Sequence, residues 1–196
     1  MDSFEQIVAD LKAQRYKPVY FLMGDEAYFI DEIVHYIEKE VLDEAEKSFN
    51  QTILYGKDTD IPTVVSEAKR FPMMSDRQVV ILKEAQHIRD WTPLESYVEQ
   101  PQTSTLLVIA HKYKTFDKRK ALFKKLSKSN AVVLESKKMY DDKVPGWIEK
   151  KVQQLGFKIM FKSAALLFEF LGNDLGKIAK ELEKLEILLS PGQEIT

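Results

Sequence analysis

Residues 18–42 read PVYFLMGDEAYFIDEIVHYIEKEVL, and this stretch decides the fold. Its first part is a nearly all-apolar run that ends at Gly24, as expected of a strand buried on both faces of a parallel sheet. The second part repeats apolar residues at steps of four, which predicts an amphipathic helix. These residues are Phe29, Ile33, Ile37 and Val41. A buried strand, a glycine turn and a helix in succession favour an α/β domain.

The same alternation continues on both sides of this stretch. Short runs rich in β-branched and apolar residues predict four further strands, at 50–56, 77–82, 103–110 and 131–136. Helical patterns precede or separate the strands at 4–14, 60–70, 92–99 and 117–128. Strands that alternate with helices predict a five-stranded parallel sheet with crossover helices.

The pattern changes to helices only after about residue 140. Three helical segments follow at 144–156, 161–172 and 173–190, each closed by Gly or by a Ser-Pro-Gly stop. The last predicted helix places one apolar face at Leu175, Ile178, Ala179, Leu182, Leu185 and Leu189. The segment SKKMYDDK at 136–143 fits neither pattern. We therefore expect an α/β domain over residues 1–140 and a small helical domain over 141–196.

Composition excludes several classes of protein. The 196 residues are 44% hydrophobic, and 29 basic against 31 acidic residues give a net charge of -2, so no global field attracts nucleic acid or membrane. The chain has no cysteine, which excludes disulfides and thiolate chemistry and fits a reducing compartment. Neither a signal peptide nor an apolar run long enough to span a membrane is visible. These features predict a soluble, cytoplasmic protein.

The turn after the first strand is where an α/β domain would carry a phosphate-binding loop. Such a loop requires GxxxxGK[ST], so that backbone N–H groups and a lysine can approach the phosphates. Gly24 is instead followed by DEAYFID, whose acidic and bulky side chains would repel and crowd a nucleotide. We expect no nucleotide here, although a degenerate P-loop NTPase is one alternative.

Catalytic and metal-binding residues are not evident elsewhere. His35, His87 and His111 are far apart in the sequence, and no second histidine lies at metal-ligand spacing from any of them. Paired acids such as Asp31 and Glu32 fall near a helix start, where the helix dipole already explains them. We therefore expect neither enzymatic activity nor a cofactor.

The strongest local charge feature is HKYKTFDKRKALFKKLSKSN at residues 111–130. Lysines interleaved with aromatic residues can contact the phosphates and bases of DNA, which makes direct DNA binding a second alternative. The candidate contacts are Lys118, Arg119, Lys120, Lys124 and Lys125. The simpler interpretation, a solvated helix with Phe123 and Leu126 facing the core, is favoured.

The segment FPMMSDRQVVIL at residues 71–82 is unusual because its first half is apolar although it precedes a strand. Pro72 interrupts the chain, so Met73 and Met74 are expected in a connection rather than in a helix. Connections run over the surface and are usually polar. Composition alone would favour methionines that cover the edge of their own sheet.

Four stretches, in this order, resemble the delta subunit of the bacterial replicative clamp loader of DNA polymerase III. They are PVYFLMGDEAYFIDE, FPMMSDRQVVILKEA, STLLVIAHK and GNDLGKIAKELEKLEIL, and together they span nearly the whole chain. The resemblance implies an AAA+ type, RecA-like core without nucleotide binding, followed by a helical lid domain. It also implies a fragment, since delta subunits continue into a collar domain after the lid.

The resemblance further implies a binding site and its partners. In the family, two hydrophobic residues before the third strand insert into the β sliding clamp, and they align with Met73 and Met74. Phe71, Pro72, Ser75, Asp76 and Arg77 would frame them. The implied partners are the clamp, the ATPase (gamma/tau) subunits, the delta-prime subunit and, within the assembly, primed DNA. The implied function is non-catalytic: to bind the clamp and stabilise its open ring during DNA replication.

Overall fold

The computed structural model describes residues 1–188 and 194–195. The chain divides into two compact units, residues 1–137 and 138–196, which are described separately. None of the described helices is both long and apolar enough to cross a membrane.

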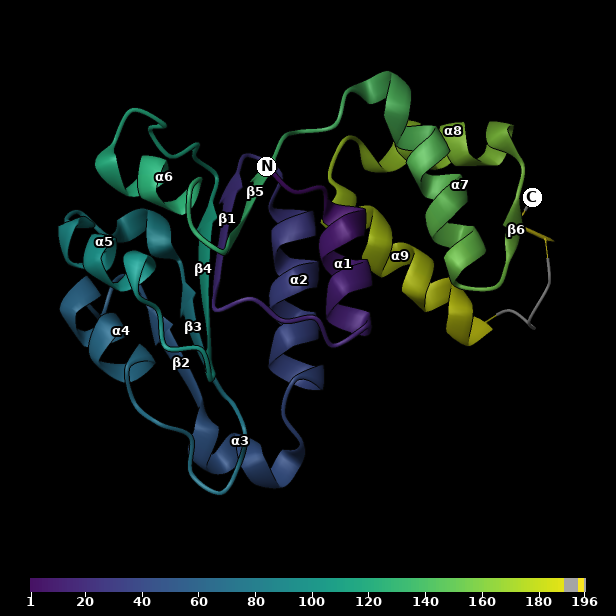
Figure 1. The fold of residues 1–196 in the computed structure, drawn as a ribbon. Helices are drawn as coiled ribbons and strands as arrows, with labels where there is room; N and C mark the ends of the chain where they lie inside the picture. Colours follow the sequence, from purple (N-terminus) through teal and green to yellow (C-terminus); the bar gives the residue numbers. More distant parts are fainter. Residues whose placement is uncertain (189–193, 196) are drawn as a thin grey trace. The chain divides into compact units, whose positions relative to one another are not determined.

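The first unit is built on a five-stranded sheet (Figure 1). Its strands lie in the order β2-β3-β4-β1-β5, and every neighbouring pair is parallel. The interior strand β1 pairs with both β4 and β5, and Phe21 lies in register with Ile109 on one side and Val133 on the other. The strands are β1 (Val19–Gly24), β2 (Gln51–Tyr55), β3 (Gln78–Lys83), β4 (Thr105–Lys112) and β5 (Ala131–Ser136).

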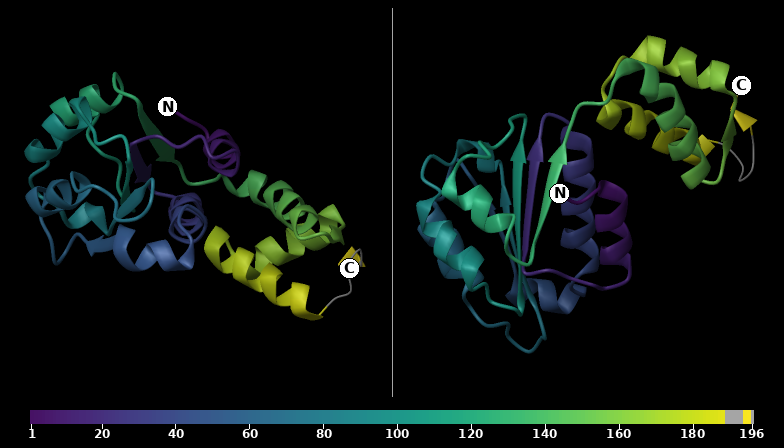
Figure 2. Two further views of the ribbon diagram at one scale, coloured as in Figure 1. Left: turned by 60° about the horizontal axis from the view of Figure 1, so that its bottom comes forward. Right: turned by 45° about the horizontal axis from the view of Figure 1, so that its top comes forward.

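Helices cover both faces of this sheet (Figure 2). Successive side chains of a strand point to opposite faces, so Tyr20 and Leu22 pack in one core layer and Phe21 and Met23 in the other. The first layer is completed by α1 (Phe4–Lys12) and α2 (Ala27–Glu40), and the second by α4 (Ile61–Ala68), α5 (Thr92–Glu99) and α6 (Ala121–Leu126). The predicted parallel sheet with flanking helices is confirmed.

The turn between β1 and α2 is packed tightly against the end of β5. Gly24 adopts φ +136°, and a Cβ on it would lie 1.9 Å from the carbonyl oxygen of Ser136. Next to it, the Glu26 N–H donates to the Ser136 carbonyl (3.2 Å), and the Ser136 hydroxyl donates to the Glu26 carbonyl (2.7 Å). Only glycine fits this position, because any side chain would meet backbone atoms.

Several elements differ from the sequence prediction. The sequence reading left residues 43–49 unassigned, but α3 (Glu44–Asn50) forms there behind a capping box in which Asp43 and Glu46 bond each other's backbone N–H. Asn50, expected in a strand, ends this helix. The last helix of the unit is only six residues long, because Asp117 accepts hydrogen bonds that hold Arg119 in a preceding turn. The buried side of α2 is formed by Ile30, Ile33, Val34 and Ile37, so Phe29 and Val41 are only partly buried.

The second unit contains three helices and one short strand pair among its described residues. The helices are α7 (Val144–Gln154), α8 (Phe161–Leu171) and α9 (Leu175–Leu188). The apolar face of α9 is buried as predicted at Leu175, Ile178, Ala179 and Leu182, whereas Leu185 is only partly buried and Leu189 lies outside the described residues. The expectation of helices only is wrong, because β6 (Lys158–Ile159) pairs in parallel with β7 (Glu194–Ile195). Two-residue strands are too short to show a periodicity.

Replacing Gly24 by alanine should destabilise the first unit by about 2 kcal/mol or more, because the new methyl group would overlap the backbone at Ser136. Urea denaturation would measure the loss. Gly146→Ala is the matched control, since no atom lies within 4 Å of its added Cβ and the residue is in α7. It should leave the free energy of unfolding unchanged or raise it by up to about 1 kcal/mol. Equal effects of the two substitutions would contradict the packing described here.

Candidate functional site

The connection between α4 and β3, residues 69–77, is closed at its base by one buried side chain. The Gln78 amide donates to the carbonyl of Arg70 (2.6 Å) and to the hydroxyl of Thr105 (2.7 Å). Gln78 opens β3, so it ties the start of the strand to the chain that leaves α4. Because all strands are parallel, the connection lies at the amino edge of the sheet, beside α3 (Figure 1).

The middle of this connection is held by Asn50, a residue that sequence reasoning missed. The N–H of Met73 donates to Asn50 Oδ1 (2.6 Å), and Asn50 Nδ2 donates back to the Met73 carbonyl (2.9 Å). Only 3% of Asn50 is exposed, so these bonds are shielded from water. The two residues are far apart in the sequence, and no local pattern could have indicated this contact.

The three large apolar side chains of the connection point into solvent. Met73 is 52% exposed, Phe71 is 77% exposed, and Met74 is fully exposed. Met74 also adopts φ +52°, in the left-handed region that non-glycine residues rarely occupy. The alternative that these methionines cover the edge of their own sheet is contradicted for Met74 by its full exposure, whereas about half of Met73 is buried.

The remaining residues of the segment fix its exit into β3. Ser75 exchanges two hydrogen bonds with the backbone of Arg77, accepting from its N–H (3.2 Å) and donating to its carbonyl (3.1 Å). The guanidinium of Arg77 lies 4.8 Å from the centre of the Tyr16 ring. Pro72 is partly buried and Asp76 is exposed. The predicted residues therefore form one ordered segment that presents Phe71, Met73 and Met74.

At the opposite edge of the sheet, an acidic side chain caps the helix that follows β1. Glu26 is the N-cap of α2, and its carboxylate accepts the N–H of Tyr28 (3.0 Å). Helix N-termini attract anions, and here that place is taken by the protein's own buried carboxylate.

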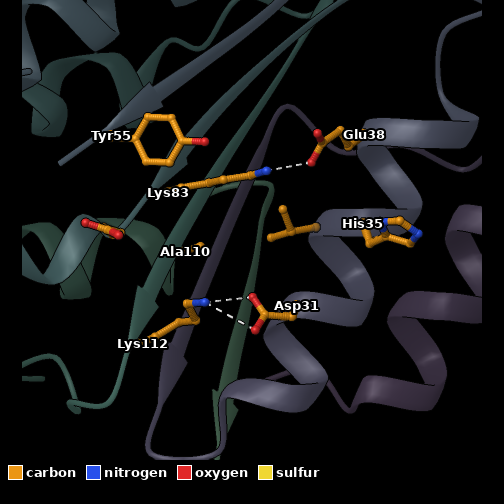
Figure 3. A pocket seen from close by; sticks show the side chains of 9 residues that line it. Asp31, His35, Glu38, Tyr55, Lys83, Ala110 and Lys112 are labelled. Carbon is orange, nitrogen blue, oxygen red and sulfur yellow. Dashed lines mark hydrogen bonds and ion pairs between the residues drawn. The ribbon is translucent and has the colours of Figure 1, made fainter. Parts of the chain in front are cut away.

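A cavity lies at the carboxyl ends of β2, β3 and β4, and the positive charges of its lysines are paired with carboxylates of the protein itself (Figure 3). It has a volume of about 320 Å³ and is bounded on one side by α2. Lys83 bonds to Glu38 (2.7 Å), and Lys112 bonds to both carboxylate oxygens of Asp31 (2.9 and 3.2 Å). The two ammonium groups that could have met phosphates are thus paired with carboxylates of α2.

The histidines do not converge on a site. His35 and His87 are exposed, whereas His111 is buried and its Nδ1 lies 3.0 Å from the carbonyl oxygen of Lys114. Burial lowers the pKa of His111. Across residues 1–188 and 194–195, no three His, Asp or Glu side chains are grouped so that they could hold a metal ion.

The basic segment is tied largely to the protein itself. Phe116 and Phe123 are buried, and the Phe116 ring packs 5.2 Å from that of Phe21, so neither can stack on a base. Tyr113 is exposed and Lys124 is solvent-facing. The other candidate DNA contacts have internal partners: Lys118 pairs with Glu135, Arg119 with Asp117, Lys125 with Glu95 and Glu99, and the Lys120 ammonium lies 5.2 Å from the centre of the Phe116 ring.

The strand order and the helices on both faces define an AAA+ type α/β core. A Thermotoga maritima DNA polymerase III gamma subunit-related protein shares this fold, with a TM-score of 0.51 at 14% identity over 94% of this chain and 58% of that one. The family model of the DNA polymerase III delta subunit matches residues 20–137. The chain belongs to this family.

Two relatives from Bacillus subtilis resemble the chain over nearly its whole length. The DNA polymerase III subunit delta of strain 168 is 28% identical over an alignment of 196 positions that covers 95% of this chain and 56% of that protein. The solved structure of the DNA clamp loader delta protein YqeN superposes with a TM-score of 0.80 at 26% identity, covering 99% of this chain and 60% of that one. The chain therefore spans somewhat more than half the length of these relatives.

Met74→Gly should raise the free energy of unfolding by up to about 1 kcal/mol. Glycine adopts positive φ without strain, and the exposed methionine side chain loses no packing. Met73→Gly is the matched control, because its φ is not positive and half of its side chain is buried. The control should lower the free energy of unfolding, by about 1 kcal/mol. Urea denaturation of both variants measures the difference. A lower free energy of unfolding for Met74→Gly would contradict the inference that the backbone is strained at Met74.

Proposed function

We propose that this chain is the clamp-binding part of a clamp-loader delta subunit. It binds the β sliding clamp through Met73 and Met74, which enter an apolar pocket of the ring, with Phe71, Pro72, Ser75 and Arg77 framing them. The observation that carries this proposal is the fully exposed Met74 on a segment whose backbone is held by buried hydrogen bonds. An apolar group that is both ordered and exposed has the character of an interface anchor.

The free energy available from this contact is sufficient for a specific interface. Burying each methionine side chain would contribute roughly 1.5–3 kcal/mol. Methionine is unbranched and polarizable, so it adapts to an irregular apolar pocket. Because Asn50 and Gln78 already fix the segment, little further ordering would oppose binding.

Ring opening follows if the contact differs between the closed and open clamp. A binder shifts such an equilibrium only by its differential affinity for the two states. Met73 and Met74 would therefore bind near the interface between clamp subunits and hold the open ring. In the proposed assembly, the ATPase (gamma/tau) subunits, the delta-prime subunit and primed DNA are the further partners, and this chain performs no chemistry.

The closed turn after β1, at the carboxyl edge of the sheet, supports a role without nucleotide. The Glu26 carboxylate caps α2, and Gly24 is closed against Ser136, so the turn between β1 and α2 is not open to enclose a phosphate. Chemistry would then belong to the partners of this chain.

Direct DNA binding through residues 112–128 is the weaker candidate. Four of its candidate contacts are exposed, namely Lys118, Arg119, Lys120 and Lys124. The ion pairs of Lys118, Arg119 and Lys125 would have to be exchanged for phosphates. Exposed ion pairs contribute little, so the exchange is physically allowed. A steep salt dependence of binding to primed DNA without any clamp would favour this function.

The double variant Met73→Ser, Met74→Ser should lose at least about 100-fold in affinity for the cognate β clamp, because both apolar anchors are removed. Calorimetric titration into the clamp measures the affinity, and urea denaturation verifies that the variant is folded. Met160→Ser is the matched control, since Met160 is 54% exposed in the second unit. It should bind like the native chain. Equal binding by the double variant, or no binding by the native chain, would refute the proposed function.

The chain should show no saturable binding of Mg-ATP up to about 1 mM in calorimetry. The physical reason is that the helix N-terminus that would meet the phosphates is occupied by Glu26. Saturable binding, or release of phosphate by the purified chain, would instead support the degenerate P-loop NTPase.

A further inference from the structure

We infer that the end of α3, Phe49 and Asn50, is a second component of the clamp-binding surface. Asn50 is a positioning residue that holds the backbone of Met73, and Phe49 makes an additional apolar contact with the clamp. This inference rests on the proposed binding of the clamp by Met73 and Met74.

The Asn50 side chain is suited to hold a strand-like backbone. Its amide accepts from the Met73 N–H and donates to the Met73 carbonyl, as a neighbouring strand would do. An asparagine amide offers both an acceptor and a donor, whereas an aspartate carboxylate can only accept. The Met73 carbonyl would then face a negative charge without a hydrogen bond.

A capped helix sets the orientation of Asn50. Asp43 and Glu46 form the capping box of α3, and the helix ends at Asn50 immediately before β2 enters the sheet. The seven-residue helix α3 therefore fixes the position of Met73 relative to the sheet. Met74 follows the held residue directly and extends away from the protein in its left-handed conformation. Without Asn50, the tip would sample many conformations, and binding would have to order it.

Four of the seven large, exposed apolar or aromatic side chains of the first unit lie on these two segments, and the other three are Met1, Tyr55 and Tyr113. Within residues 1–137, all of which the structure describes, the exposed phenylalanines are Phe49 and Phe71. Apart from Met1, the exposed methionines are Met73 and Met74. Phe49 is 65% exposed and is the immediate neighbour of Asn50, so the hydrogen bonds of Asn50 join both segments into one surface. Aromatic side chains are frequent anchors of protein interfaces.

The test measures affinity for the cognate β clamp by calorimetry, for the native 196-residue chain and for single variants. Asn50→Ala removes both hydrogen bonds, and Asn50→Asp keeps the side-chain size but removes the donor. Each, like Phe49→Ser, should weaken binding about tenfold. The matched controls are in the second unit: Asn173→Ala, where an asparagine amide also bonds a methionine carbonyl, and Phe170→Ser, where an exposed ring is removed. Both controls should bind like the native chain.

A double-mutant cycle separates positioning from general destabilisation. Asn50→Ala should weaken binding about tenfold in the native background but less than about twofold in a Met74→Ala background, because Asn50 acts by presenting that side chain. Partial unfolding would lower the binding-competent fraction by the same factor in both backgrounds.

The possible outcomes are distinct. Unchanged affinity of Asn50→Asp, or an equal loss in both backgrounds, would overturn the positioning by Asn50. Unchanged affinity of Phe49→Ser would overturn its contact with the clamp. Failure of the native chain to bind would overturn the proposed function itself, and that result is read from the native titration before any variant is measured.

Discussion

The burial of β1 is the constraint on which the rest of this structure depends. All six of its residues are buried, and the strand pairs with β4 on one edge and β5 on the other. Its end must therefore turn in the space left beside Ser136, which only a glycine permits. That turn places the carboxylate of Glu26 on the start of α2.

The two edges of the sheet consequently differ in character. In open α/β sheets, ligands bind outside the carboxyl ends of the strands, but here the turn after β1 is closed against Ser136 and the lysines of the cavity are paired with Asp31 and Glu38. The amino edge carries exposed apolar groups on a connection that ordinarily would be polar. The exposed apolar groups of this sheet therefore lie at the edge opposite to the one where α/β proteins usually bind ligands.

Rigidity is what distinguishes the exposed segment from a hydrophobic loop. Gln78 closes its base, Asn50 holds its middle, and Ser75 fixes its exit. These bonds leave Met74 in a strained conformation that the surroundings maintain. An exposed apolar side chain on a mobile loop would favour non-specific contacts, whereas a held one can meet a pocket of defined shape.

The sequence by itself determined the five strands, the helices that separate them, the failed phosphate loop and the apolar segment around Met73 and Met74. These are local properties, since they depend on periodicity, on glycine and proline, and on residue types within a few positions. It did not predict α3 or the short pair of β6 and β7, whose few residues show no period. Only the tertiary structure decided that Met74 is exposed, that Asn50 holds Met73, and that two lysines of the basic segment and two of the carboxyl edge are paired with carboxylates. Each of these joins residues distant in the chain, and such contacts exist only after the sheet has brought its edges and helices together.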